Sequence, residues 1–385
     1  IGPLAGGYLS EWTWRAIFWI NIPVAILSLI FIYISKPEET RRPQPIDYRG
    51  AVLVCIGMAL AVLGLQQSSI WGWGNPVTWI CIVGGLLVLA GFVAFEMKQE
   101  HPLIRVAIFR DRSFAVDNVL LFLLSIAFVP LFFFASMYAQ LSLDWQASEA
   151  GLYLLIFFSG FATAAQFGGR ILDSRGARPT VVLGCLLATV GFFLWAMKLT
   201  DLDGGSNAQW PFIVLTGAGF GFLLGPVATD AVNRAPNTSY GEATGITQTV
   251  RNYGASVGMA VLGTILILRN KANIESELNG IVPTSEAHRI ADQVSSAGSG
   301  GMSGSGGSSG SEKIYHAIQD AFAQSSKTVF LCMAGVMAVC FLVALIGSPS
   351  GKMEEVFADE EEAPGAEAAT GPRPGSPDPA EPAPD

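Results

Sequence analysis

The feature that most constrains this chain is a series of long apolar stretches that contain almost no charged residues. A helix needs roughly 20 such residues to cross the hydrocarbon of a bilayer, and the backbone there has to satisfy its own hydrogen bonds. About nine stretches qualify, near residues 15–34, 50–66, 77–95, 114–138, 149–168, 179–197, 210–230, 241–268 and 327–347. Residues 1–9 look like the end of one more helix. The sequence therefore predicts an all-α polytopic membrane protein whose bundle covers residues 10–347.

Composition supports this class. Hydrophobic residues make up 51% of the chain and charged residues only 14%, which excludes an ordinary soluble protein. The net charge of −9 comes mostly from the end of the chain, where ten acidic side chains after Gly351 stand against Lys352 and Arg373. Residues 348–385, rich in Pro, Ala, Glu and Asp, are therefore expected to form a disordered acidic tail.

The connections between the stretches alternate in basic content. Links 67–76 and 139–148 have no Lys or Arg, and 198–209 has only Lys198. The links between them carry the basic residues, which are Lys36, Arg41, Arg42, Arg49, Lys98, Arg105, Arg110, Arg112, Arg170, Arg175, Arg178 and Arg234. By the positive-inside rule, these basic links and the C-terminus are expected in the cytoplasm and the chain in the cell membrane.

One long link, 269–326, is expected on the outer side. Its centre, Ser295 to Ser311, is nearly all Gly and Ser. Residues 312–325 place Ile314, Ile318 and Phe322 four residues apart, which predicts an amphipathic helix lying at the outer surface before the last span.

Two segments have more specific patterns. The link after residue 168 has the spacing Gly-x-x-x-Asp-x-x-Gly-x-Arg, formed by Gly169, Asp173, Gly176 and Arg178. A tight turn favours Gly176, and Asp173 could form a charge-assisted cluster with the neighbouring basic residues Arg170, Arg175 and Arg178. A plain positive-inside turn explains the basic residues but not this spacing.

The second pattern opens the chain. It combines Gly2-Pro3 and Gly6-Gly7 with Trp14-Arg15 and Asn21-Ile22-Pro23, and the chain begins inside it without a methionine. Together with the spacing after residue 168 and the segments 101–114, 138–140 and 242–254, it resembles the fourteen-helix drug:proton antiporters of the major facilitator superfamily. Ser174 departs from the family pattern, which usually has a basic residue there.

This resemblance implies a major facilitator fold in which the nine spans are helices six to fourteen and residues 1–9 end helix five. The chain is then expected to be an N-terminally truncated part of a transporter. The resemblance assigns an antiporter motif to Gly2, Pro3, Gly6 and Gly7. It assigns a cytoplasmic gate loop to Gly169, Arg170, Asp173, Arg175, Gly176 and Arg178. The implied activity is proton-coupled efflux of amphipathic drugs by alternating access.

Polar residues inside spans are costly and often functional. The candidates are Arg251, Asp117, Asp230 and Gln140. Arg251 either lies within the bundle or extends to the inner interface. Asp117 and Asp230 lie near basic helix ends, which favours gate or interface roles over proton carriage. Gln140 either lines the outer vestibule or merely ends its span.

Aromatic residues concentrate in two neighbouring spans, where Phe132, Phe133, Tyr138 and Phe157 could form part of a pocket for bulky apolar or cationic ligands. For any single one, contact with lipid or packing is the favoured explanation, and a pocket is expected only from the residues taken together. Glycines recurring every four residues, at 217, 221 and 225, at 241 and 245, and at 254 and 258, predict close helix packing.

No other chemistry is indicated. The three histidines are isolated and the five cysteines show no ligand spacing, so no metal site or other cofactor is expected and a proton gradient would supply the energy. No nucleotide-binding loop is found and no enzymatic activity is expected. The expected partners are membrane lipid and an amphipathic small molecule, not nucleic acid. The alternatives are a transporter of one specific metabolite and, in another class, a membrane scaffold or sensor.

Overall fold

The computed structural model of the chain describes residues 2–35, 47–99, 102, 104, 106–202, 204–235, 240–279, 282–283, 288–290, 309–349 and 351. These residues are nearly all helical, and their one β interaction is an isolated bridge between Asn279 and Val282. The elements are α1 (Gly2–Trp12), α2 (Ala16–Trp19), α3 (Asn21–Ser35), α4 (Tyr48–Trp71), α5 (Pro76–Glu96), the 3-10 helix η1 (Val106–Arg110), α6 (Arg112–Leu141), α7 (Ala147–Arg175), α8 (Ala177–Lys198), α9 (Gly205–Asn233), α10 (Tyr240–Glu277) and α12 (Ser309–Gly347).

Within this described part, nine helices are long and apolar enough to cross a membrane, one for each stretch expected from the sequence. The prediction of an all-α chain with about nine spans is therefore confirmed. The N-termini of two of them show why they start where they do: Asp47 accepts hydrogen bonds from the backbone of Arg49 and Gly50, and Asn75 caps α5 ahead of Pro76.

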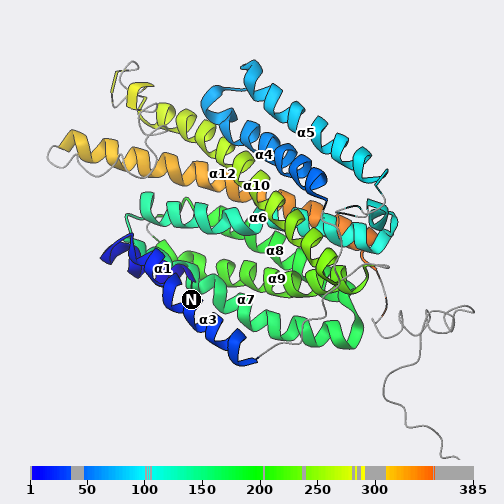
Figure 1. Cartoon of the computed structure of the whole chain (residues 1–385). Helices are drawn as coiled ribbons and strands as arrows, with labels where there is room; N and C mark the ends of the chain where they lie inside the picture. The colour runs from blue at the N-terminus through cyan, green and yellow to red at the C-terminus, as the bar shows by residue number, and fades with distance from the viewer. Residues whose placement is uncertain are drawn as a thin grey trace, which may run out of the picture.

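Six helices, α6 to α10 and α12, form one bundle around a shared apolar core (Figure 1). Within it, α9 packs between α7 and α8, and α12 contacts α6, α8 and α10. The largest side chains that are fully buried come from five different helices and include Tyr138, Tyr153, Trp195, Phe220 and Phe330. Such mutual burial defines the bundle as the rigid unit on which any site is built.

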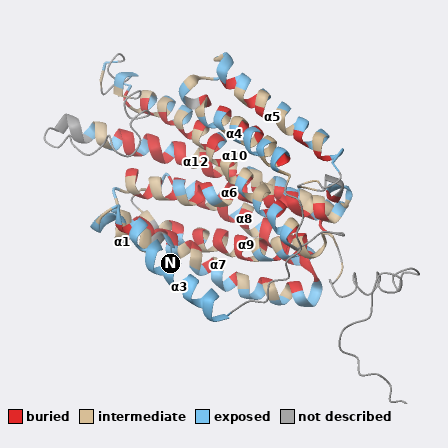
Figure 2. Cartoon of the chain, viewed as in Figure 1, coloured by how far each residue is buried: buried red, intermediate tan, exposed pale blue. Residues whose placement is uncertain are grey.

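The remaining helices flank this bundle. α4 and α5 pair with each other, and α4 lies against α10, where the hydroxyls of Ser68 and Thr264 are 3.3 Å apart. α1 lies on α7. α3 differs from all the others because every one of its residues is exposed (Figure 2). An exposed and largely apolar helix is the arrangement expected for contact with lipid or with a further part of a membrane protein.

The helices of the predicted outer link extend further than the sequence indicated. α10 continues to Glu277 and α12 starts at Ser309, so residues 312–325 are the first part of the last membrane helix. The expectation of a separate helix lying at the surface is wrong. The extended ends are held together by a small apolar cluster and by a 2.9 Å hydrogen bond from Asn273 to Ser325. Most of Ser295–Ser311 and the predicted tail from residue 352 lie outside the described residues.

The glycine series divide into packed and unpacked positions. Methyl groups on Gly217 and Gly221 would overlap α7 carbonyls, and methyl groups on Gly254 and Gly258 would come within 2.6 Å or less of α6 carbonyl oxygens. Here the packing prediction is confirmed. It is wrong for Gly225, the last glycine of the first series, and for both glycines of the second series, Gly241 and Gly245. All three face open space.

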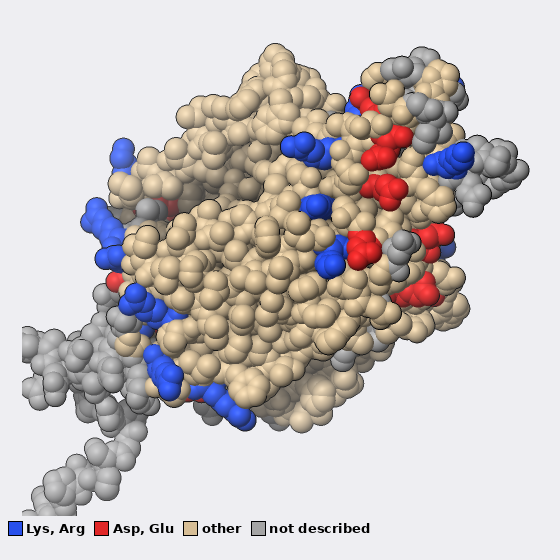
Figure 3. Space-filling view, turned by 180° about the vertical axis from the view of Figure 1, so that it is seen from behind, with Lys and Arg blue, Asp and Glu red and all other residues tan. Residues whose placement is uncertain are grey.

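Three arginines from separate links meet at the end of α12. Arg112 donates to the carbonyl oxygen of Ile346 at 3.3 Å, and Arg178 to that of Leu345 at 3.1 Å. Arg234 donates to the carbonyl of Gly351 at 3.4 Å. At this end of the molecule Lys and Arg lie with few acidic neighbours, whereas at the other end acidic side chains lie among further Lys and Arg (Figure 3). These links thus share one side, which we call the basic end. The carbonyls at the end of α12 are orphan acceptors that favour such cations.

Candidate functional site

The N-terminal segment that resembles an antiporter motif forms the continuous helix α1, which is not interrupted at Gly6 and Gly7. Gly7 is buried against α7, where a Cβ atom would come within 2.5 Å of the carbonyl oxygen of Ala147. A Cβ atom on Gly2 or Gly6 would meet nothing within 4 Å. Pro3 lies in the same helix. Close by, Glu11 accepts a hydrogen bond of 2.7 Å from the backbone of Ser148. Hydrogen bonding from the side chain of Ser148, together with this backbone bond, lowers the pKa of the Glu11 carboxyl group. The segment therefore docks on the first turn of α7.

The predicted gate loop joins α7 to α8 at the basic end. Gly176 adopts a φ of 82°, so the expected glycine turn is confirmed. The expected charge cluster is not formed. Asp173 is exposed, and it makes no ion pair or hydrogen bond among the described residues. Arg178 instead donates to the carbonyl of Leu345 near the end of α12. Gly169 is half-buried, and Arg170 and Arg175 are exposed like Asp173. The separation follows from helix geometry, because Asp173 lies on the exposed side of α7.

A buried polar network that the sequence did not single out ties together four helices near the end opposite the basic end. Its centre is Gln209 in α9, whose amide group donates to the hydroxyl of Tyr138 at 2.9 Å and accepts from the hydroxyl of Tyr153. The indole of Trp195 donates to the same Tyr153 hydroxyl at 2.9 Å. All four side chains are buried. In the sequence, the signal that could have indicated this network was Gln209, a single Gln at the start of an apolar stretch.

We expect Gln209→Leu to lower the stability of the bundle. The change leaves the Tyr153 hydroxyl without an acceptor, and such a buried unsatisfied group costs about 1–3 kcal/mol. The matched control is Gln140→Leu, because the Gln140 amide is half-buried and donates only within its own helix, to Ser136. The midpoint of heat-induced loss of monodisperse protein in detergent should fall for the first variant and hardly move for the second. Equal midpoints would contradict a structural role for the network.

Asp117 and Asp230, predicted near the basic ends, come together inside the bundle. Asp117 in α6 is 1% exposed and Asp230 in α9 is 0% exposed. Their carboxyl groups lie close enough to act on each other. The Nε of Arg234 donates to Oδ1 of Asp230 at 2.8 Å. The structure thus places two acids and one base from two helices in one buried cluster.

Arg251 is half-buried on α10 and donates to Gln248 on the same helix at 3.4 Å. Its Nε is buried without a hydrogen-bond partner among the described residues. The amide nitrogen of Gln248 in turn donates to Oδ1 of Asn252 over a long 3.5 Å. Gln248 and Asn252 are exposed and, with Gly241 and Gly245, follow one side of the helix. We call these four residues and the half-buried Ser256 the polar face of α10.

The four predicted pocket aromatics do not share one wall. Tyr138 and Phe157 are 0% exposed in the core, because the former is bound in the polar network and the latter is enclosed by other rings. Phe133 is 50% exposed and touches only Phe134 among the rings. Phe132 is half-buried and stacks on Phe158 with centroids 5.3 Å apart. Its ring also meets that of Phe157, with centroids 5.4 Å apart, so the structure brings these two of the four together.

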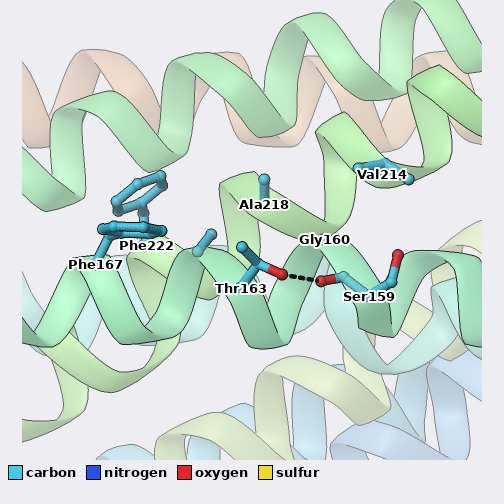
Figure 4. Close-up of a pocket in the computed structure, with 8 residues that line it drawn as sticks. Ser159, Gly160, Thr163, Phe167, Val214, Ala218 and Phe222 are labelled. Carbon is cyan, nitrogen blue, oxygen red and sulfur yellow. Dashed lines mark hydrogen bonds between the residues drawn. The ribbon is translucent and has the colours of Figure 1, made fainter.

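A pocket of about 370 Å³ lies instead between α7 and α9 (Figure 4). Phe167 and Phe222 lie at one end of it, and the hydroxyl of Thr163 donates to the carbonyl of Ser159 at 2.8 Å along its side. The other lining residues are Gly160, Ala164, Val214 and Ala218. The pocket is thus apolar, with few polar groups, and its volume matches a small organic molecule.

Comparison with known proteins identifies the family. The profile described as "Major Facilitator Superfamily" matches residues 1–259. The chain is 30% identical over 271 residues to the tetracenomycin C resistance and export protein of Streptomyces glaucescens, covering 70% of this chain and 50% of that protein. It is 28% identical to the lincomycin resistance protein LmrB of Listeria monocytogenes, covering 72% and 59%. It is 25% identical to the multidrug resistance protein Stp of Mycobacterium tuberculosis, covering 89% and 64%.

The chain thus spans between half and about two thirds of the length of these relatives. The match includes the N-terminal segment, the turn after α7 and most of the first half of α10, which are the segments that carried the resemblance. With its all-helical membrane architecture, the chain belongs to the Major Facilitator Superfamily.

Proposed function

We propose that this chain is part of a proton-coupled exporter of amphipathic compounds in the cell membrane. The observation that carries the proposal is the polar face of α10. Gln248 and Asn252 are exposed in a helix whose length and composition suit a membrane span. Contact with lipid would leave much of the hydrogen-bonding capacity of their amide groups unused, so such a face belongs against water or against other protein.

A water-lined path beside α10 is what a transporter requires. The opposite side of α10, with Gly254 and Gly258, is packed on α6, so the polar face points away from the bundle. The pocket between α7 and α9 is likewise open, since Ser159, Thr163 and Phe167 are exposed. Both features favour passage of a largely apolar molecule with a few polar groups.

The class of substrate and the direction of transport are inferred from the relatives, whose names describe resistance and export. In this proposal the basic end faces the cytoplasm, as the positive-inside rule predicts. The energy comes from the proton gradient, and no prosthetic group is required. Transport of one specific metabolite is the competing function, because a pocket of this volume suits either kind of molecule.

The test is a transport assay of the protein as the cell makes it, in a drug-sensitive host and in proteoliposomes. Export of the amphipathic dye ethidium should depend on an inward proton gradient and should stop when an ionophore collapses that gradient. Competition by unrelated amphipathic cations would support a broad pocket. Absence of any flux for a panel of such dyes would contradict the proposal, and competition by a single compound only would favour the metabolite transporter.

The gate loop gives a specific prediction. We expect Asp173→Asn to reduce ethidium export several-fold while the amount of folded protein in the membrane stays close to wild type. The carboxylate is exposed and makes no ion pair or hydrogen bond among the described residues in this conformation, so its loss costs little stability here. A role in transport then requires a second conformation in which Asp173 finds a partner. Ser174→Ala is the matched control, since the hydroxyl of Ser174 donates within its own helix, to the carbonyl of Arg170. Wild-type export by Asp173→Asn would refute the gate assignment.

A further inference from the structure

The cluster of Asp117, Asp230 and Arg234 has an unbalanced charge. Arg234 is the cation that contacts it, through its bond to Oδ1 of Asp230. Asp111, at the N-cap of α6, is the other charged group close enough to act on Asp117. Among the described residues, no charged side chain from α7, α10 or α12 acts on either acid. Two ionised carboxylates against one guanidinium would therefore leave one negative charge buried and uncompensated.

One bound proton would resolve this imbalance, because both acids are buried and Arg234 can neutralise only one of them. An ionised carboxylate only accepts hydrogen bonds, so a proton on one acid also lets that acid donate to the other. The second oxygen of each acid, Oδ2, is buried without a hydrogen-bond partner among the described residues. Burial of an unpaired charge costs several kcal/mol, which a single bound proton removes.

The position of the pair suits exchange of that proton. Asp117 lies in the second turn of α6, which starts at Arg112, and Asp230 lies one turn before the end of α9 at Asn233. Both are thus buried and yet close to the boundary of the bundle at the basic end. A small separation of the two helix ends would move the acids apart and admit water to both.

We propose that Asp117 and Asp230 together bind one exchangeable proton, and that this site takes part in proton coupling. The second half of this inference rests on the proposed function. In the described conformation the proton is bound between the acids, with Arg234 neutralising the remaining charge. Separation of α6 from α9 ionises the second acid and releases the proton.

The first experiment is infrared difference spectroscopy of the protein as the cell makes it, reconstituted in nanodiscs. The stretching band of a protonated carboxyl should be present, should shift in heavy water, and should disappear in Asp117→Asn, which keeps the shape and polarity of a neutral acid. Asp230→Asn provides an independent variant of the same pair. Asp111→Asn is the matched control, because asparagine caps a helix as well as aspartate and the band should remain.

The outcomes separate the site from the function. A carboxyl band that is unchanged in both Asp117→Asn and Asp230→Asn would overturn the proton site. A band that neither responds to pH nor exchanges in heavy water would show a fixed structural proton, which also contradicts the proposal. If the wild-type protein exports ethidium and export by Asp117→Asn still depends fully on a proton gradient, the site binds a proton but takes no part in coupling, which contradicts the second half of the proposal. If wild-type protein transports nothing, the band still reports on the site.

Discussion

Gly217→Val should prevent normal packing of α7 on α9. Even a methyl group at this position would overlap the carbonyl oxygen of Phe157 and lie 3.2 Å from the backbone nitrogen of Phe161. Because the obstacle is helix backbone, no side-chain rotation relieves it. Overpacking of this kind typically costs about 1–3 kcal/mol, and a second methyl group adds to the overlap. Without a hydrophobic drive between helices in lipid, such close contact supplies much of the association.

The measurement is the amount of folded protein in the membrane together with its heat stability in detergent. Gly225→Val is a sharp control, because it makes the same change on the same helix. Gly225 belongs to the same four-residue series, but it is exposed and a Cβ atom there would meet nothing within 4 Å. We expect Gly217→Val to lose much of the folded protein and of its heat stability, and Gly225→Val to change both only by the small effect of helix propensity. Equal losses would mean that helix propensity, not interhelical contact, decides the outcome.

These glycines also show what a sequence can predict. The spacing of four residues identifies one side of a helix, and for Gly217 and Gly221 that side faces α7. The spacing contains no information on where the neighbouring helix ends or turns away. For this reason Gly225, Gly241 and Gly245 were predicted to pack and do not. Helix existence, in contrast, followed from local hydropathy alone, and the nine spans were found where they were expected.

The extended ends of α10 and α12 were missed for a related reason. Their residues are too polar to be read as membrane spans. The two extended ends also contact each other, which a local pattern does not reveal. Asn273 bonds to Ser325, and Gln324 donates to Glu277 at 3.1 Å. The partners are 52 and 47 residues apart in sequence. A local pattern predicts a helix there but not its continuity with the adjoining span.

The candidate site was only partly predictable. Asp117 and Asp230 could each be placed near a basic helix end, which favoured roles at a gate or interface. That they lie close together is a consequence of packing between α6 and α9. The aromatic residues show the reverse case. Tyr138 looked like a ligand contact, but its hydroxyl is bound to Gln209 and to the carbonyl of Leu199 at 2.8 Å. Composition indicates that aromatic residues are abundant, and it does not indicate which of them are enclosed.

Arg234→Met is the second change with a large expected effect. The guanidinium side chain is 9% exposed and is the cation paired with Asp230, which is 0% exposed. Removing one partner of a buried ion pair typically costs about 3–5 kcal/mol, because the remaining charge keeps its desolvation penalty without its counterion. Here two acids lose the same cation. The heat-stability midpoint of the purified protein should therefore fall sharply.

Arg178→Met serves as the control for Arg234→Met, since Arg178 donates to the carbonyl of Leu345 in the last turn of α12 and Arg234 to that of Gly351 just after it. Arg178 is exposed and has no acid partner among the described residues, so its loss should cost less than about 1 kcal/mol. The double variant Arg234→Met with Asp230→Leu should regain most of the lost stability, because Asp117 alone can remain neutral. If the double variant is no more stable than Arg234→Met, the damage comes from the lost bond to Gly351 and from altered packing. Recovery would show that the buried cation is needed only because two acids share its site.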